Sequence, residues 1–272
     1  MGLNVLTVLP KFFCVSLAFF CLFSVSSYCI AQDSQTKDTF SQHRHTMDVE
    51  LKFAEVAGMS MEQEIHKGMG RELLETALTN IGLTYSVEFL PWSRLMKSVS
   101  DNPKALMLPL GRTEQRENRF QWVEPIFTAH FGFVSRQRPI NTLQEASQQT
   151  YIGVWKNTLF ESYLRQKGLN NLVPFRGDEK LGLLFEGGRI TSWFGELNET
   201  RYRLKQFNLH RKQPISPIYF GAPVNEIQAW LIAGKEFPDK QLKAIRDELH
   251  RLNQSGFADQ LFNKYYRLDP IK

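Results

Sequence analysis

A continuous apolar run near the middle of the chain constrains its fold more than any other feature. The residues from Ala105 to Leu110 are apolar and are followed by Gly111. An uninterrupted run of this length, ended by glycine, is typical of a β-strand covered on both faces, as in parallel α/β sheets. Such sheets bind ligands beyond the carboxyl ends of their strands. Arg112 and Arg116 follow at once, so the sequence predicts two guanidinium groups, which pair well with carboxylates, at a binding position.

Strand-like and helix-like patterns alternate on both sides of this run. Before it, the sequence predicts strands at 49–56 and 84–89 and helices at 68–81 and 91–99. After it, the predicted elements are strands at 126–135, 151–155, 191–196 and 217–224, and helices at 142–146, 159–167, 177–185 and 240–252. Regular alternation of this kind predicts an α/β protein with parallel strands.

The first 31 residues have the composition of a secretory signal. They contain one charged residue, Lys11, then an apolar stretch from Phe12 to Val25, and they end at Ala31 before polar residues. This pattern predicts cleavage after Ala31 and a location in the periplasm. The alternative is a permanent membrane anchor, but the apolar stretch is shorter than the ~20 residues that a spanning helix needs.

The mature chain would contain no cysteine, because Cys14, Cys21 and Cys29 all lie in the predicted signal. Cleavage would therefore exclude disulfides, thiol nucleophiles and thiolate metal sites. The 241 residues after the signal are enough to build one large or two modest hydrophobic cores. The net charge of +5 is spread along the chain, so the sequence gives no indication of nucleic-acid binding.

Residues 32–46 are polar and have no hydrophobic periodicity, so we expect a flexible lead-in. His43 and His45 in this segment raise the alternative of a metal site. Histidines in a tail of this kind are usually solvated, and we expect neither a metal nor a cofactor.

The residues around the apolar run resemble a known family. The segment Thr113-Glu114-Gln115-Arg116 precedes an aromatic-rich segment that ends in Pro125-Ile126-Phe127. Together they resemble the Thr-Pro-Glu-Arg and Phe-Ser-x-Pro-Tyr signature of the family 3 extracellular solute-binding proteins. These are periplasmic receptors that feed amino acids and similar solutes to ABC importers. The order of elements and the ending from Gly256 to Tyr266 also resemble this family, so the resemblance covers nearly all of the mature chain.

The resemblance implies the type II periplasmic binding protein fold. In that fold two α/β lobes, each a mainly parallel sheet flanked by helices, are joined by a two-strand hinge. Residues 47–136 and 219–268 would form the first lobe, and residues 137–218 the second. The resemblance further implies a monomer that closes over a small ligand and presents it to a membrane permease or a sensor.

The same resemblance assigns roles to three side chains. Arg116 matches the family's carboxylate-binding arginine, and Trp92 matches the aromatic residue that lies against the ligand. Glu196 falls where the family often places the aspartate that takes the ligand's ammonium. A receptor needs such groups because a buried charge without a partner costs several kcal/mol. The alternatives are that Arg116 pairs with Glu117 or Asp178, that Trp92 lies in the core, and that Glu196 is a solvated loop acid.

Further ligand contacts follow from two other turns. Asn157 and Thr158 lie in the turn with which the family holds the ligand's acidic end, although simple capping of the next helix is an equal alternative. Arg112, together with Arg94, would add cationic contacts and favour a dianionic or larger acidic solute.

The chain also departs from the family. Members that bind ordinary α-amino acids usually have Ser or Thr hydroxyls where this chain has the residues from Leu108 to Gly111, and Pro109 has no backbone N–H to donate. An α-amino acid is therefore the default expectation for the ligand rather than a firm one.

Two other functions compete with a transport receptor. One is an enzyme on the same fold, such as a dehydratase, and the other is a sensory or orphan receptor. The mature part shows no His-Glu-x-x-His, Gly-x-Ser-x-Gly or glycine-rich phosphate motif. We therefore expect a non-catalytic protein that binds an amino acid or a similar carboxylate-bearing solute.

Overall fold

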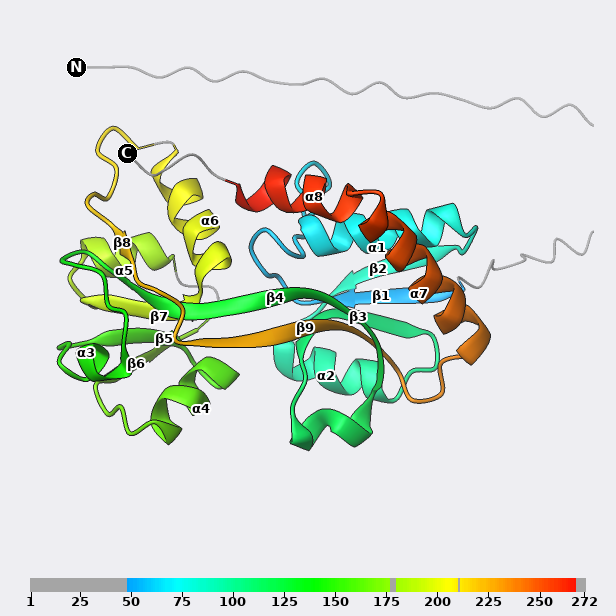
Figure 1. Cartoon of the computed structure of the whole chain (residues 1–272), viewed down its shortest axis with the longest axis horizontal. Helices are drawn as coiled ribbons and strands as arrows, with labels where there is room; N and C mark the ends of the chain where they lie inside the picture. The colour runs from blue at the N-terminus through cyan, green and yellow to red at the C-terminus, as the bar shows by residue number, and fades with distance from the viewer. Residues whose placement is uncertain (1–47, 177–179, 210, 268–272) are drawn as a thin grey trace, which may run out of the picture. The chain divides into compact units, whose positions relative to one another are not determined.

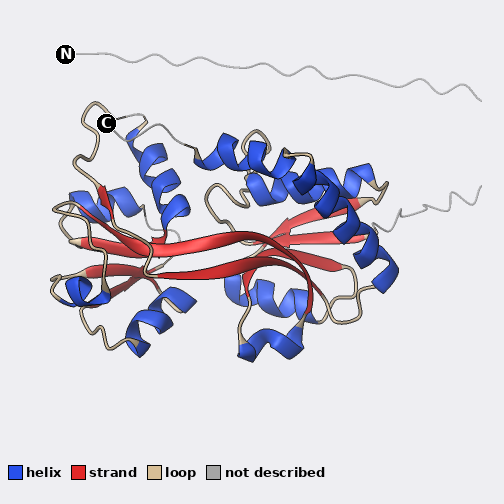
Figure 2. Cartoon of the chain, in the orientation of Figure 1, coloured by secondary structure: helices blue, strands red, loops and turns tan. Residues whose placement is uncertain are grey.

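One mixed β-sheet runs through the part of the chain that the computed structural model describes, which is residues 48–176, 180–209 and 211–267 (Figures 1 and 2). These residues all lie in one unit, His45–Lys272. The predicted signal lies outside them. The strands are β1 (Val49–Phe53), β2 (Tyr85–Phe89), β3 (Ala105–Gly111), β4 (Gln121–Ser135), β5 (Ile152–Trp155), β6 (Leu172–Phe175), β7 (Ser192–Glu196), β8 (Tyr219–Phe220) and β9 (Asn225–Ala233).

Parallel strands occupy both ends of the sheet, and antiparallel strands occupy its middle. The order is β2-β1-β3-β9-β4-β7-β5-β6, with β8 paired to β4. Strand β1 runs parallel to β2 and β3, and β5 runs parallel to β6 and β7. Strands β4 and β9 run antiparallel to each other and to their other neighbours. The α/β prediction is confirmed, with a sheet that is mixed because β4 and β9 pass between its two parallel parts.

Helices cover both faces of the sheet (Figure 1). In α1, the apolar residues Leu73, Leu74, Ala77 and Leu78 are buried as their helical spacing predicts. The helical elements are α1 (Met69–Asn80), α2 (Trp92–Ser100), α3 (Leu143–Ser147), α4 (Leu159–Gln166), α5 (Leu181–Glu186), α6 (Leu197–Asn208), α7 (Asp239–Gln254), α8 (Phe257–Tyr266) and the 3-10 helix η1 (Glu114–Arg119).

The hydrophobic core is divided between the two ends of the sheet. Phe53 and Leu74 belong to clusters built from β1, β3, β9 and the helices α1, α7 and α8. Trp193 packs in a second group around β7 and α5, and Phe194 packs in a neighbouring cluster with β4 and β5. Full burial of one such side chain contributes about 1.5–3 kcal/mol. Each end of the sheet therefore has its own core, and β4 and β9 connect the two.

The predicted return strand at 217–224 is wrong. The structure places the return strand at β9, eight residues later, and leaves only the two-residue β8 in the predicted segment. Pro217 and Pro223 lie in that segment and have no N–H to donate to a neighbouring strand, which disfavours a regular ladder there.

The elements α6, β6 and α8 have no counterpart among the predicted strands and helices. Helix α6 has few apolar residues and buries only Thr200 and Leu204, so its sequence carries little helical periodicity. Strand β6 is short and contains Pro174. The helix predicted at 177–185 is α5, four residues later at its start, and residues 177–179 lie outside the described residues.

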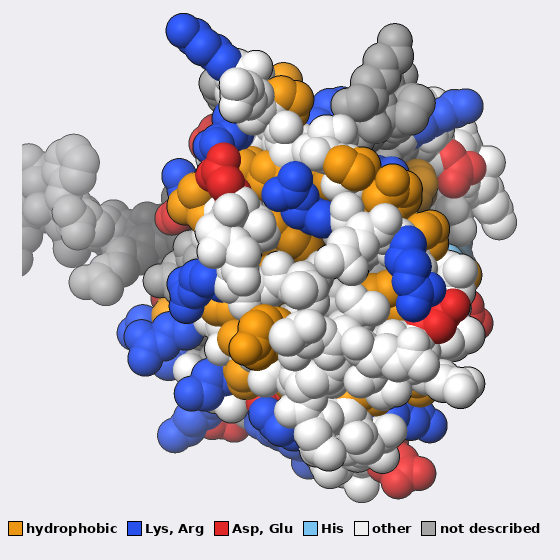
Figure 3. Space-filling model, turned by 90° about the vertical axis from the view of Figure 1, so that its left-hand side faces the viewer, with side chains coloured by type: hydrophobic (Ala, Val, Ile, Leu, Met, Phe, Trp, Pro, Cys, Tyr) orange, Lys and Arg blue, Asp and Glu red, His pale blue; other side chains and the backbone are white. Residues whose placement is uncertain are grey.

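Positive charge is concentrated at the end of the molecule that contains β5, β6 and β7. Residues 137–218 hold 12 Lys and Arg against 7 Asp and Glu, whereas residues 47–136 and 219–268 hold 17 against 18. Figure 3 shows this end of the molecule, where Lys and Arg side chains lie as separate groups with hydrophobic side chains between them. An excess of positive charge favours the approach of anionic solutes.

Candidate ligand-binding site

The turn that follows β3 lies beside the start of α4, so the two ends of the sheet meet there. A Cβ atom placed on Gly111, the last residue of β3, would lie 3.4 Å from Leu159 Cδ2 and 3.1 Å from Ile227 Cδ1. Leu159 is the first residue of α4. The end of β3, which leads into the turn of Arg116, and the start of α4, which follows Thr158, are therefore neighbours. A ligand contact from both remains a prediction.

Arg116 is a half-buried cation in η1. Its Nη1 donates a hydrogen bond to the carbonyl oxygen of Gly111 at 3.0 Å. Within the described residues Arg116 forms no ion pair, because the neighbouring Glu117 pairs with Arg112 instead; Asp178 lies outside these residues. Burial lowers the pKa of Arg116, and the nearby Arg119 lowers it further. The guanidinium nevertheless stays charged at neutral pH, so a cation is partly withdrawn from water without a carboxylate beside it.

Arg112 has a different environment from Arg116. Its Nε donates to Glu117 Oε2 at 2.9 Å, and its Nη2 donates to the other carboxylate oxygen. Its guanidinium carbon lies 5.1 Å from the ring centre of Trp122 and 4.8 Å from that of Trp230. The charge of Arg112 is already compensated within the chain, and a ligand contact from it remains a prediction.

Trp92 is the first residue of α2 and 36% of its surface is exposed. It does not belong to the described hydrophobic clusters, which contain its neighbours Leu90, Leu95 and Met96. The alternative that Trp92 is a core residue is therefore excluded. Arg94, two residues further on, is also exposed. A ligand contact from Trp92 remains a prediction.

Asn157 and Thr158 form the turn into α4. Asn157 adopts a positive φ of 59°, and its backbone N–H donates to Glu161 Oε2 at 2.8 Å. The Thr158 hydroxyl donates back to the carbonyl of Trp155 at 2.7 Å and does not cap the helix. The Thr158 side chain therefore does not cap α4. A ligand contact from this turn remains a prediction.

Glu196 ends β7 and caps α6, and it is buried rather than solvated. Only 6% of its surface is exposed. Its Oε2 accepts a hydrogen bond from the backbone N–H of Glu199 at 2.6 Å, and its Oε1 accepts one from Asn198 Nδ2 at 3.2 Å. Burial raises the pKa of Glu196 to about 7, although the backbone N–H groups of Glu199 and Asn198 oppose this rise. The sequence missed this capping role because it did not predict α6.

Tyr266, which no sequence pattern assigned to the site, is buried in the core around β1, α1 and α7. Its ring packs against Gly58, where a Cβ atom would lie 2.5 Å from Tyr266 Cε1. Its hydroxyl donates to the carbonyl oxygen of Ala57 at 3.4 Å. Burial raises the pKa of Tyr266 well above its usual value, and the carboxyl groups of Glu196 and Glu199 raise it further. Helix α8, which carries Tyr266, packs against α6.

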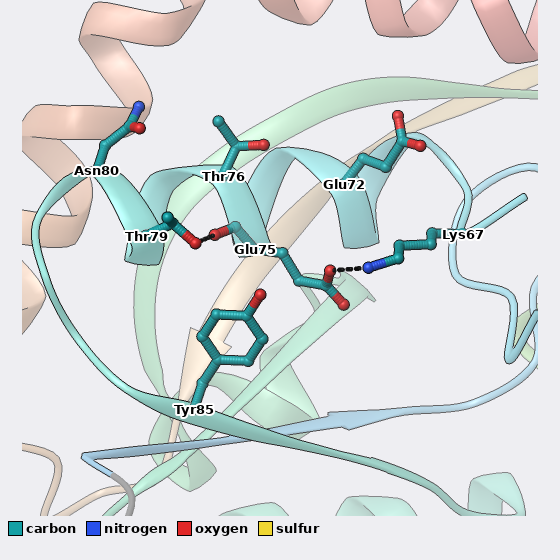
Figure 4. Close-up of a pocket in the computed structure, with 7 residues that line it drawn as sticks. All are labelled: Lys67, Glu72, Glu75, Thr76, Thr79, Asn80 and Tyr85. Carbon is teal, nitrogen blue, oxygen red and sulfur yellow. Dashed lines mark hydrogen bonds and ion pairs between the residues drawn. The ribbon is translucent and has the colours of Figure 1, made fainter. Parts of the chain in front are cut away.

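A separate pocket lies between α1 and β2, away from the residues that the sequence assigned. Figure 4 shows its lining side chains, among them Thr79 and Tyr85. Its volume is about 300 Å³. The buried Glu75 carboxylate in it is bonded to Lys67 at 2.7 Å and to Arg71 at 2.6 Å. These charges compensate one another, so a charged ligand would gain less electrostatic stabilisation in this pocket than beside Arg116.

Two surveys of the described residues bear on membrane and metal functions. Within residues 48–176, 180–209 and 211–267, no helix combines the length and apolar character needed to cross a membrane. Over the same ranges, no group of three or more His, Cys, Asp or Glu side chains is placed to hold a metal ion.

Comparisons with known proteins identify the fold. No protein-family model matches the chain, and no curated protein matches its sequence. A histidine kinase sensor domain with similarity to periplasmic binding proteins has a TM-score of 0.68 at 13% identity, covering 82% of this chain and 97% of that one. The substrate-binding protein of an amino acid ABC transporter has a TM-score of 0.64 at 15% identity, covering 81% and 99%. An ancestral amino acid-binding protein, a precursor of cyclohexadienyl dehydratase, has a TM-score of 0.65 at 13% identity, covering 80% and 94%.

These matches extend over nearly the whole of the three solved chains, which are a kinase sensor domain, a substrate-binding protein and an ancestral amino acid-binding protein. At such low identities the similarity is one of fold. The chain described here has the two-lobed α/β fold of the periplasmic binding proteins, as its sequence predicts.

Proposed function

We propose that this chain is an exported receptor that captures a small carboxylate-bearing solute between two lobes, without catalysing a reaction. The lobes are residues 47–136 with 219–268, and residues 137–218. The observation that carries the proposal is the half-buried Arg116, which has a hydrogen bond to Gly111 but no ion pair within the described residues. An acidic ligand would supply the missing negative charge.

A carboxylate suits Arg116 for geometric and energetic reasons. The planar guanidinium offers two parallel N–H donors that match the two carboxylate oxygens. Hydrogen bonds to charged groups contribute about 1.5–3 kcal/mol each. The exposed ring of Trp92 would add stacking or cation–π energy of about 0.5–2 kcal/mol if it lies against the ligand.

Capture would depend on movement of the lobes about the strands that join them. Strands β4 and β9 pair over most of their lengths and continue from one core to the other. A rotation about these strands would change the separation between the turn carrying Arg116 and the turn carrying Thr158. Hinge closure of this kind shields a ligand from water and strengthens its charge pairs.

The partner that reads the closed state is proposed to be an ABC permease, and a membrane sensor is the second candidate. Both candidates have support, because both an ABC-transporter protein and a kinase sensor domain share the fold. Deletion of the gene distinguishes them. Loss of uptake of the labelled ligand supports the importer, whereas loss of a transcriptional response with uptake intact supports the sensor.

The enzyme alternative is tested directly with substrates. A dehydratase on this fold would need an available acid or base, and the buried Glu196 is occupied by the N-terminus of α6. We expect no turnover when the protein is incubated with prephenate-like or arogenate-like compounds and the mixture is followed by mass spectrometry. Product formation at a rate proportional to protein concentration would replace the receptor proposal with an enzymatic one.

A thermal-shift screen tests the receptor proposal itself. The mature protein is heated with amino acids, organic acids and polyamines, each at a high concentration. A ligand present at 100 times its Kd adds ~2.7 kcal/mol to the free energy of unfolding. We expect stabilisation by one or more carboxylates. Stabilisation by polyamines alone, or by no compound, would contradict the proposal.

Export is tested on the protein recovered from cells. We propose that residues 1–31 are removed, so mass spectrometry of the periplasmic protein should find Gln32 at or near its amino terminus. An intact Met1 in the membrane fraction would show that the apolar stretch is an anchor instead.

A further inference from the structure

Two apolar side chains lie next to the residue to which Arg116 is bonded. The Arg116 Nη1 donates to the carbonyl oxygen of Gly111 at 3.0 Å. A Cβ atom on Gly111 would lie 3.1 Å from Ile227 Cδ1, on β9, and 3.4 Å from Leu159 Cδ2, at the start of α4. All four residues are partly exposed. The cation and the two apolar side chains therefore meet at Gly111, where solvent still reaches them.

The start of α4 presents hydrocarbon at this junction. The Thr158 hydroxyl, which precedes the helix, donates back to the carbonyl oxygen of Trp155 at 2.7 Å. The next two residues, Leu159 and Phe160, are apolar and partly exposed. The side chain that reaches Gly111 from this helix is Leu159, and it offers no hydrogen-bond donor or acceptor.

The two apolar side chains are held in place by the core beneath them. Leu159 and Ile227 both pack against the cluster that contains Phe131, Phe133 and Phe194. Side chains packed on a dense core keep defined positions. Ligand sites are usually preformed surfaces of this kind, with a small number of polar groups that fix orientation. Arg116 would be such a group.

We propose that the ligand of this receptor is a carboxylate whose hydrocarbon body lies against Leu159 and Ile227, so that these two side chains select apolar over polar ligands. This inference rests on the proposed function and specifies its ligand class. Arg116 would hold the carboxylate, and the ligand's carbon chain would extend over the apolar surface. A hydroxyl or an amide placed there would lose its water without gaining a hydrogen bond from either side chain.

Pairs of isosteric carboxylates test this inference, because only the polarity of the body differs within a pair. The pairs are 4-methylpentanoate with succinamate, 3-methylbutanoate with 3-hydroxybutanoate, L-leucine with L-asparagine, and L-valine with L-threonine. Each compound is titrated into the mature protein by calorimetry. In the pair that binds best, we expect the apolar member to bind about 10-fold more tightly or better. A smaller difference, or the reverse order, would overturn the inference and leave the proposed function in place.

The thermal-shift screen separates failure of the inference from failure of the proposed function. A carboxylate from the screen that binds more tightly than every member of the pairs, and that carries only polar groups beyond its carboxyl, would also overturn the inference. If no carboxylate binds, the proposed function itself fails.

A variant of the apolar surface gives a second test. Leu159→Asn keeps the shape of the side chain and makes it polar. Leu172→Asn is its matched control, because Leu172 is also partly buried and packs against the same cluster, but lies in β6 at the edge of the sheet. We expect the preference for the apolar member to shrink by about 5-fold or more in Leu159→Asn and to persist in Leu172→Asn.

A smaller change in a folded Leu159→Asn protein, or an equal change in both variants, would contradict the inference. If Leu159→Asn does not fold, as judged by circular dichroism, the isosteric pairs on the unaltered protein decide the matter.

Discussion

The two charged residues that the sequence placed at opposite ends of one ligand have opposite surroundings. Arg116 is half-buried, and within the described residues it is bonded only to a carbonyl oxygen. Glu196 is almost fully buried and accepts hydrogen bonds from the backbone N–H of Glu199 and the side-chain amide of Asn198. A charged side chain at a matching position is thus available to a ligand only where the protein has not already compensated it.

The cause of this difference is local. Glu196 immediately precedes α6, whose first N–H groups need acceptors, and a side chain at that position supplies one. Arg116 lies in the short helix η1, where the neighbouring acid, Glu117, pairs with Arg112, whose guanidinium lies over the rings of Trp122 and Trp230. The Glu196 carboxylate is therefore engaged in helix capping, whereas the Arg116 guanidinium has no carboxylate partner within the described residues.

The largest effect is expected from removing the uncompensated cation. Arg116→Ala should weaken binding of the carboxylate found in the screen by about 2–5 kcal/mol, because the ligand's charge loses its counter-ion. Arg116→Lys should restore only part of this loss, since an ammonium lacks the planar pair of donors.

Arg119→Ala is the matched control for Arg116→Ala, because Arg119 lies in the same η1 helix, is exposed and lies over the Phe120 ring. Isothermal titration calorimetry should show wild-type affinity for it. Equal losses in Arg116→Ala and Arg119→Ala would mean that general charge, and not Arg116, attracts the ligand.

The next effect tests the position of Tyr266 through its contact with Gly58. Gly58 has φ 76° and Gly82 has φ 73°, but only at Gly58 would a Cβ atom meet Tyr266, since nothing lies within 4 Å at Gly82. Alanine at either position carries about 1–2 kcal/mol of backbone strain. Gly58→Ala should cost about 1–3 kcal/mol more because of overpacking.

Urea unfolding of the Gly58→Ala and Gly82→Ala proteins measures that difference. Equal losses of stability would place the Tyr266 ring elsewhere.

The third prediction concerns the pH dependence of stability at Glu196. Burial raises the pKa of Glu196 to about 7 in the folded state, from 4.5 in an exposed setting. The folded protein therefore binds a proton on Glu196 more tightly than the unfolded chain does. The stabilisation that results is complete below about pH 4.5 and is lost as the pH rises through about 7. Glu196→Gln removes the ionisable group. Between pH 4.5 and pH 8, the free energy of unfolding of this variant should therefore rise by up to about 3 kcal/mol relative to that of the wild type.

Urea unfolding at pH 5 and at pH 8 measures this change for both proteins. If the two proteins lose stability in parallel between these two pH values, Glu196 is already ionised in the folded state. Its carboxylate would then be able to pair with an ammonium.

The smallest effect is expected at Arg112. Because this side chain is held by Glu117 and packed near Trp122 and Trp230, Arg112→Lys should lower the melting temperature slightly and leave ligand affinity unchanged. Thermal unfolding and calorimetry on the same sample measure both quantities. A clear loss of affinity with no change in melting temperature would show that Arg112 contacts the ligand, as the sequence predicted.

The fold was largely predictable because its first elements carry strong local patterns. The strand from Ala105 has a continuous apolar run, and the helix from Met69 has apolar residues at helical spacing. Both patterns can be recognised from a few neighbouring residues. Helix α6 and strand β9 were missed or misplaced for a physical reason. The helix is mostly polar, and the proline-containing segment before β9 resembles a strand in composition only.

The candidate site was predictable only in part. The position of Arg116 after a buried strand follows from the sequence, and its half-buried environment agrees with a binding role. The occupation of Glu196 does not follow, because it depends on an unpredicted helix. The burial of Tyr266 depends on how α8 packs against α1, α7 and α6, and such tertiary contacts leave no local pattern.

The measurement that tests the central claim most directly is a crystal structure of the mature protein with the carboxylate that stabilises it most. The account predicts both ligand oxygens within about 3 Å of the Arg116 guanidinium nitrogens. It also predicts that the Tyr266 ring remains against Gly58 and that no ligand atom bonds to Glu196. A ligand bound in the pocket between α1 and β2, or one that leaves Arg116 bonded only to Gly111, would contradict the account.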